Sequence, residues 1–212
     1  MESIHRSNIC AISPIDGRYA TKTEKFKDIF SEYGLIRNRI IVEIKWLESL
    51  CDNDQVTHAK TLSIEAQKFL NSIIENFSYE RADKIKEIEK TTNHDVKSVE
   101  YFLKDSFDDS KELKELVPFI HFGCTSEDIN NLSHGLMLKE GKEKIILPEI
   151  EQILARLSSM SQEHAGISML SRTHGQTASP TTLGKEMANF FYRLTKQLRK
   201  FEEINLLGKM NG

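Results

Sequence analysis

The fold is decided by the segment Leu35–Cys51, LIRNRIIVEIKWLESLC, which contains neither glycine nor proline. Its apolar side chains recur at Ile40, Ile44, Leu47 and Cys51, in steps of four, three and four residues. This spacing puts all four on one face of an α-helix. The segment therefore predicts an amphipathic helix whose apolar face packs against a core.

The same pattern extends outward from this segment. No glycine occurs from residue 35 to residue 122, and Pro118 is the only proline there. Because these residues end or break helices, and no sustained alternation of apolar and polar residues marks a strand, the sequence predicts an all-α fold. We expect Gly34 to interrupt the first of the remaining stripes. Those stripes are Phe26, Ile29, Phe30 and Tyr33; Ala66, Phe69, Leu70, Ile73 and Phe77; and Val96, Val99, Leu103 and Phe107.

Longer helices are expected in the second half of the chain. One is expected to bend at Pro148, and the last carries apolar residues from Leu183 to Phe201, with a polar stretch before it. Two antiparallel helices cannot enclose a core, because a helix bundle generally has about four. We therefore predict an N-terminal helical domain over residues 1–115 and the beginning of a truncated helical-bundle domain over residues 116–212.

Composition and charge exclude several functional classes. The 212 residues include 29 Lys and Arg and 32 Asp and Glu, a net charge of −3, so no basic field is available to attract nucleic acid. No apolar run approaches the ~18 residues of a membrane helix, and the first residues lack the apolar stretch of a signal peptide. Cys10, Cys51 and Cys124 form neither a disulfide framework nor a zinc motif. We expect a cytoplasmic protein that binds no nucleic acid, membrane or metal.

Polar clusters interrupt the helical pattern at expected turns and helix starts. In Asp16-Gly17-Arg18-Tyr19, an arginine after a tight turn presents its guanidinium to a phosphate or carboxylate, although an incidental exposed arginine is the simpler interpretation. In Thr91-Thr92-Asn93-His94-Asp95, helix capping explains every residue except His94. A cation is disfavoured at a helix N-terminus, so this histidine is expected to be neutral or to face a bound anion.

Two further clusters combine hydroxyls with other polar groups. In Gly123-Cys124-Thr125-Ser126-Glu127-Asp128, the pair Thr125 and Asp128 resembles a capping box, and a helix start rich in hydroxyls also binds anions. In Ser171-Arg172-Thr173-His174-Gly175-Gln176-Thr177, His174 lies off every apolar stripe. An imidazole, whose unperturbed pKa is about 6.5, suits proton transfer there. A solvent-exposed loop is the alternative.

Taken together, these clusters resemble those of the fumarase/aspartase superfamily, and within it those of the bacterial adenylosuccinate lyases. The matching segments are residues 13–19 (SPIDGRY), 90–97 (KTTNHDVK), 121–134 (HFGCTSEDINNLSH), 171–176 (SRTHGQ) and 184–189 (GKEMAN). The ordered set spans the chain and is far more specific than any single motif. The resemblance implies a homotetramer of three-domain helical subunits, without metal or organic cofactor, of which this chain covers the first domain and the opening helices of the second.

The resemblance also implies a reaction, the β-elimination of fumarate from adenylosuccinate to give AMP. It implies the same elimination from the succinyl-carboxamide ribotide of purine biosynthesis. By correspondence, His174 is the acid that protonates the departing nitrogen. The corresponding substrate-binding residues are Arg18 and Tyr19 for the nucleotide phosphate, Asn93, His94 and Asp95 in a second segment, and Thr125 and Ser126 for the succinyl carboxylate.

One part of the family pattern is absent from the 212 residues. The catalytic base of the family is a serine in a mobile loop of the form Ser-Ser-x-Met-Pro-x-Lys-x-Asn-Pro, and no such segment occurs here. We therefore expect the chain alone to lack turnover. Two other interpretations stay open: a non-catalytic helical oligomerisation or regulatory module derived from a lyase, and another fumarate-releasing lyase of the superfamily.

Overall fold

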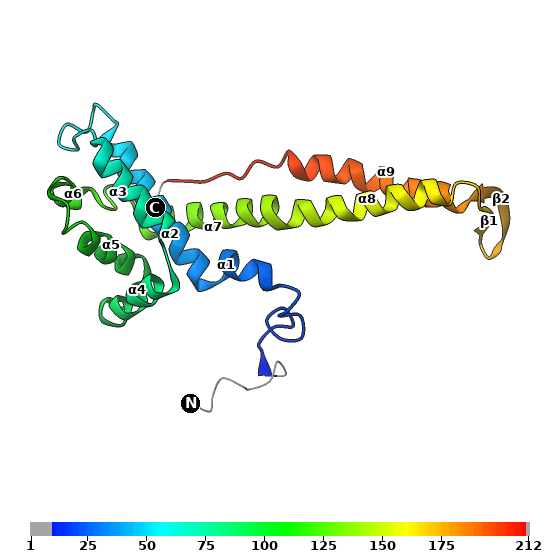
Figure 1. Cartoon of the computed structure of the whole chain (residues 1–212), viewed down its shortest axis with the longest axis horizontal. Helices are drawn as coiled ribbons and strands as arrows, with labels where there is room; N and C mark the ends of the chain where they lie inside the picture. The colour runs from blue at the N-terminus through cyan, green and yellow to red at the C-terminus, as the bar shows by residue number, and fades with distance from the viewer. Residues whose placement is uncertain (1–9, 211–212) are drawn as a thin grey trace. The chain divides into compact units, whose positions relative to one another are not determined.

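The computed structural model describes residues 10–210, and over this range it is helical apart from one β-hairpin (Figure 1). The all-α prediction is confirmed, with the hairpin as a local exception. The described chain divides into two compact units, residues 10–139 with 207–210 and residues 140–206. The domain boundary expected between residues 115 and 116 stays a prediction.

The first unit is built from short and medium helices joined by tight connections. In chain order they are η2 (Glu24–Phe26), α1 (Lys27–Phe30), α2 (Glu32–Cys51), α3 (Ile64–Glu75), α4 (Tyr79–Thr92), α5 (Asp95–Ser106), α6 (Lys111–Leu116), η3 (Val117–Phe119) and α7 (Ser126–Gly141), which continues beyond the unit. Serine hydroxyls cap four of these helix starts. The side chains of Ser31, Ser63, Ser78 and Ser110 each accept a hydrogen bond from the backbone N–H three residues on. These bonds satisfy N–H groups that have no partner inside the helix.

The core of the first unit lies between α2, α3, α4, α5 and α6, and the predicted stripes supply it. The stripe residues buried there are Ile40, Ile44, Leu47, Cys51, Ala66, Leu70, Ile73, Phe77, Val99, Leu103 and Phe107. A smaller buried cluster joins Val42 of α2, Val96 of α5 and Ile129 of α7, with Cys124 packed against it. This second cluster joins α2 to α5 and α7, and the candidate residues His94, Asp95, Thr125 and Ser126 lie at the starts of α5 and α7.

The break expected at Gly34 is wrong by three residues. The chain leaves the helical conformation at Ser31, and Gly34 lies in the first turn of α2. A Cβ at Gly34 would stand 2.1 Å from the carbonyl oxygen of Ile29 in α1. Glycine is present here because α1 and α2 approach each other closely, not because it ends a helix.

The second unit begins in an unusual turn. After α7, a π-helical segment η4 (Lys142–Ile146) leads into α8 (Leu147–Glu163), and the N–H of Leu147 donates to the Lys142 carbonyl five residues back. Pro148 has no N–H to donate, and its ring crowds the preceding turn. Widening that turn accommodates the proline. The structure therefore has a π-turn where the sequence predicts a bend.

The polar stretch that separates the last two helices, for which the sequence predicts no helix, is a β-hairpin. Strand β1 (Ser168–Thr173) pairs antiparallel with β2 (Gln176–Thr182), and His174 and Gly175 form the connection. Their φ angles of 51° and 77° are both left-handed, as a two-residue hairpin turn requires. Both strands are mostly exposed, so the sequence shows no alternation of apolar and polar residues that would predict them.

The last helix, α9 (Leu183–Glu202), lies beside α8 within the second unit (Figure 1). Leu154 and Leu198 are buried, but Ile153, Phe190 and Tyr192 are 53–61% exposed. The pair leaves much apolar surface uncovered, in agreement with the expectation that two helices cannot enclose a core.

Candidate functional site

Arg18 and Tyr19 lie in the turn that precedes η2. The N–H of Ser13 donates to the Asp16 carboxylate at 3.1 Å, and the N–H of Tyr19 donates to the Pro14 carbonyl at 3.0 Å. The Arg18 guanidinium stacks over the Tyr19 ring, 4.7 Å from its centre. Both side chains are exposed. The cation therefore stands on an aromatic surface and is open to an anion.

The second candidate segment connects α4 to α5. Asn93 ends α4 with a left-handed φ of 50°, and His94 is the N-cap of α5. The imidazole Nδ1 of His94 accepts a hydrogen bond from the Lys97 N–H at 3.1 Å. Because Nδ1 is an acceptor, the ring proton lies on Nε2. Capping therefore includes His94, which the sequence interpretation had left unexplained, and the ring is neutral in this geometry.

The start of α7 meets the start of α5. Asp128 accepts from the N–H and the hydroxyl of Thr125, at 2.8 and 3.1 Å, so one half of the predicted capping box is present. Ser126 Oγ lies 3.4 Å from His94 Nε2. The structure thus brings together two of the predicted substrate-binding segments, on the positive ends of two helices.

Arg39 of α2 ties these two helix starts to the scaffold. Its guanidinium pairs with the Asp95 carboxylate, and its Nε donates to Asn130 Oδ1 at 2.9 Å. Burial raises the pKa of Asp95, but the Val96 N–H and the Arg39 charge outweigh it, and the net pKa lies below its usual value. Asp95 therefore acts as an anchor for its segment.

Sequence reasoning missed a polar row on α2. Arg39, Glu43 and Trp46 follow the helical spacing of four and three residues, beside the apolar stripe. Glu43 contacts His121, and Trp46 donates to the Phe122 carbonyl at 2.8 Å. The available signal was that Arg39 and Glu43 lie beside the apolar stripe, because charged residues are rarely buried without a specific partner.

His174 belongs to the second unit. It stands in the two-residue turn of the β1–β2 hairpin, exposed to solvent and in a left-handed conformation. Only the local backbone fixes its position in the described chain. The turn leaves the imidazole open to solvent.

Cys124 lies between His121 and Thr125, yet it is a poor nucleophile. Burial, followed by the nearby charge of Glu43, raises the pKa of its thiol to about 12. A thiol with this pKa stays protonated near neutral pH.

The arrangement is suited to anion binding and proton transfer. The Ser126 hydroxyl, the His94 Nε2–H and the two helix N-termini can donate to a carboxylate, whereas the Thr125 hydroxyl donates to Asp128 in this structure. Within residues 10–210, no group of histidine, cysteine and carboxylate side chains is placed to hold a metal ion. Over the same range, no helix combines the length and hydropathy needed to cross a bilayer.

Comparison with known proteins identifies close relatives. An adenylosuccinate lyase of Vibrio cholerae is 50% identical over 206 residues, which is 97% of this chain and 45% of the relative. That of Legionella pneumophila is 50% identical over 202 residues, 95% of this chain and 44% of the relative. That of Escherichia coli is 47% identical over 206 residues, 97% and 45% respectively. The chain thus spans less than half the length of these relatives.

Solved structures share the fold. The fumarate lyase of Mesorhizobium sp. BNC1 matches 89% of this chain and 42% of its own with a TM-score of 0.68 at 20% identity. The 3-carboxy-cis,cis-muconate lactonizing enzyme of Pseudomonas putida matches 89% and 41% with a TM-score of 0.65 at 20% identity. The sequence model of the lyase family matches residues 17–212. The chain therefore belongs to the lyase family.

Proposed function

We propose that the chain is part of an adenylosuccinate lyase, a carbon–nitrogen lyase that eliminates fumarate from adenylosuccinate to give AMP. The same site would act on the succinyl-carboxamide ribotide of purine biosynthesis. One observation carries the proposal: relatives named adenylosuccinate lyase are about 50% identical over nearly the whole chain. From the resemblance, we also propose that the full-length protein is a cytoplasmic homotetramer that uses no cofactor.

The elimination needs a proton donor on the leaving nitrogen, and we assign this role to His174. A base removes the proton from the carbon next to a carboxylate, the C–N bond breaks, and the nitrogen of AMP takes up a proton from the imidazolium. A positioned acid contributes about 10²–10⁴-fold to such a rate. The exposed hairpin turn supports the assignment because it gives the imidazole access to a bound substrate.

The meeting of α5 and α7 would bind the succinyl end of the substrate. The Ser126 hydroxyl and the positive end of α7 suit a carboxylate, and His94 Nε2 adds a donor 3.4 Å from Ser126 Oγ. The Thr125 hydroxyl would join them by exchanging its bond to Asp128 for one to the substrate. Asn93 shapes the turn, and Asp95 anchors it through Arg39. Arg18 and Tyr19 would hold the phosphate, since a guanidinium matches phosphate oxygens in two places.

A chimera provides the test of the reaction. Residues 1–212 are joined to the remaining C-terminal part of the Vibrio cholerae relative, and the purified protein is incubated with adenylosuccinate. We expect AMP and fumarate to appear. Replacing His174→Gln should lower the rate by about 10²–10⁴-fold. His58→Gln, at an exposed site between α2 and α3, is the control and should keep the rate.

The outcomes separate the alternatives. A chimera that is helical by circular dichroism and tetrameric, yet inert toward adenylosuccinate, would contradict the proposal. Release of fumarate from another succinylated amine alone would favour a different lyase of the superfamily. The 212-residue chain by itself should release no fumarate, because the serine loop of the family is not among its residues.

A further inference from the structure

Glu43 is a carboxylate in the interior of the first unit. Its side chain is fully buried in the middle of α2, and Oε1 lies 2.6 Å from His121 Nδ1. Its other oxygen, Oε2, is buried without a hydrogen-bond partner among the residues that the structure describes. Because an unpaired buried carboxylate is strongly disfavoured, His121 is the contact that makes this residue tolerable.

The contact lies at the bend that leads into α7. His121 and Gly123 have left-handed φ angles of 60° and 73°. Histidine adopts this conformation only at a cost, so neighbouring contacts must hold it. Two such contacts come from α2, the Glu43 bond to the imidazole and the Trp46 bond to the Phe122 carbonyl. The bend ends at Thr125 and Ser126, the hydroxyls of the proposed site.

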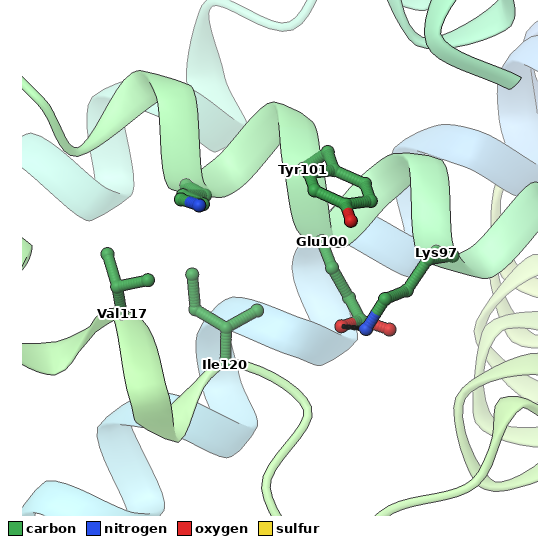
Figure 2. Close-up of a pocket in the computed structure, with 6 residues that line it drawn as sticks. Lys97, Glu100, Tyr101, Val117 and Ile120 are labelled. Carbon is green, nitrogen blue, oxygen red and sulfur yellow. Dashed lines mark hydrogen bonds and ion pairs between the residues drawn. The ribbon is translucent and has the colours of Figure 1, made fainter. Parts of the chain in front are cut away.

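A second carboxylate faces His121 from α5. Glu100 Oε1 lies 4.0 Å from His121 Nε2, beyond hydrogen-bond distance. Its other oxygen pairs with Lys97 Nζ at 2.6 Å, at the edge of a surface pocket of about 230 Å³ (Figure 2). The lysine balances the charge of Glu100. Glu43 is therefore the dominant partner of the imidazole.

We infer that Glu43 is a positioning residue, whose carboxylate grips the His121 imidazole and thereby fixes the 121–125 bend that presents Thr125 and Ser126 next to His94. The grip itself follows from the contacts above. Its consequence for the substrate rests on the proposed function.

Because the pair is charged, the interaction between Glu43 and His121 depends on pH. The hydrogen bond to Glu43 raises the pKa of His121, burial opposes this, and the charges of Glu43 and Glu100 add to the rise while Lys97 opposes it. Because the folded pKa is raised, the ion pair is fully present below the ordinary histidine value of about 6.5. It is lost as the pH rises through the raised pKa. The bend should loosen over the same range.

The test uses the full 212-residue chain and nuclear magnetic resonance. The midpoint of the His121 ring signals and the amide signals of residues 122–126 are followed against pH in the wild type, Glu43→Gln and Glu100→Gln. Glutamine keeps the size and the acceptor of Glu43 but removes its charge. We expect Glu43→Gln to lower the His121 midpoint, shift the amides of Cys124–Ser126 and speed their hydrogen exchange. Glu100→Gln should lower the midpoint less and leave these amides in place.

Two outcomes would overturn the inference. One is a Glu43→Gln chain with the wild-type midpoint and amide signals, as expected if Glu43 merely fills space. The other needs no variant: wild-type Cys124–Ser126 amides that titrate with a different midpoint from the His121 ring. In the chimera, Glu43→Gln should lower kcat/KM by about 10–100-fold. If even the unsubstituted chimera is inert, the proposed function fails while the resonance experiments still decide the grip.

Discussion

Replacing Arg39→Ala removes the link between α2 and the two helix starts of the candidate site. The Arg39 side chain is only 5% exposed, and it serves Asp95 and Asn130 at once. The two bonds differ in strength. The Asp95 side chain is 44% exposed, so water replaces much of the lost ion pair, which we assign about 1 kcal/mol.

The remaining contributions come from the buried side of the arginine. The bond from its charged Nε to the Asn130 amide oxygen contributes about 1.5 kcal/mol, at the lower end for a charged donor. Truncating the buried stem removes about 0.8 kcal/mol for each methylene whose burial is lost. Two buried methylenes, Cγ and Cδ, are lost, so we expect Arg39→Ala to lower the free energy of unfolding by about 4 kcal/mol. Arg39→Lys keeps the charge but not the fork, and should lose about half as much.

Urea unfolding of the chain, followed by circular dichroism, measures this loss. Lys60→Ala is the matched control, because the Lys60–Glu115 ion pair spans 3.3 Å between side chains that are 81% and 59% exposed. It should leave the transition midpoint unchanged. If Arg39→Ala unfolded at the same urea concentration as Lys60→Ala, the free-energy cost of burying the guanidinium would equal the free energy gained from its bonds, and the reasoning would be wrong.

Three further predictions test the scaffold and the cap. Gly34→Ala should destabilise the chain by about 1–2 kcal/mol in urea unfolding, because overpacking against the Ile29 backbone costs more than the roughly 1 kcal/mol gained in helix propensity. The control is Gly135→Ala, whose Cβ would meet nothing within 4 Å and which should stabilise the chain by about 1 kcal/mol. Equal effects of the two would refute the close approach of α1 and α2. Because the pKa of Asp95 is lowered, its carboxylate stabilises the fold above about pH 4, and this stabilisation is lost as the pH falls through the lowered pKa. The difference in unfolding free energy between the wild type and Asp95→Asn should therefore shrink in acid. A constant difference would exclude the ion pair as its source. His94→Ser should preserve or raise stability, because serine is a preferred N-cap, yet lower kcat/KM of the chimera; a stability loss like that of Ser63→Ala, about 1 kcal/mol, would show that the imidazole is needed as the cap.

Local chemistry explains why the helices of this chain were predictable. The stripe through Ile40, Ile44 and Leu47 could be read from spacing alone, and those side chains are 0–1% exposed. Helix starts at serines are equally local, because the hydroxyl and the N–H that it caps are three residues apart. The helix break at Gly34 was misplaced because the role of this glycine depends on Ile29 of the neighbouring helix.

The features that sequence reasoning missed depend on contacts distant in the chain or on exposed backbone pairing. The Glu43–His121 bond joins residues 78 positions apart, and the Arg39–Asn130 bond joins residues 91 apart. Nothing in the local pattern of α2 names these partners. The hairpin around His174 could not be predicted for another reason: its strands bury few side chains, so the sequence shows no alternation of apolar and polar residues. The motif nevertheless marked its turn correctly as a polar cluster.

At the candidate site, capping and chemistry are not competing explanations. The other described helix starts with a capping side chain, such as Ser31, Ser63 and Thr182, use a hydroxyl, which is the preferred group. The start of α5 uses His94 instead, and the cap occupies only Nδ1. Nε2 keeps its proton and points to Ser126 at the start of α7. A serine would suffice for the cap alone, so the histidine is explained by the second nitrogen, which the proposed substrate would meet.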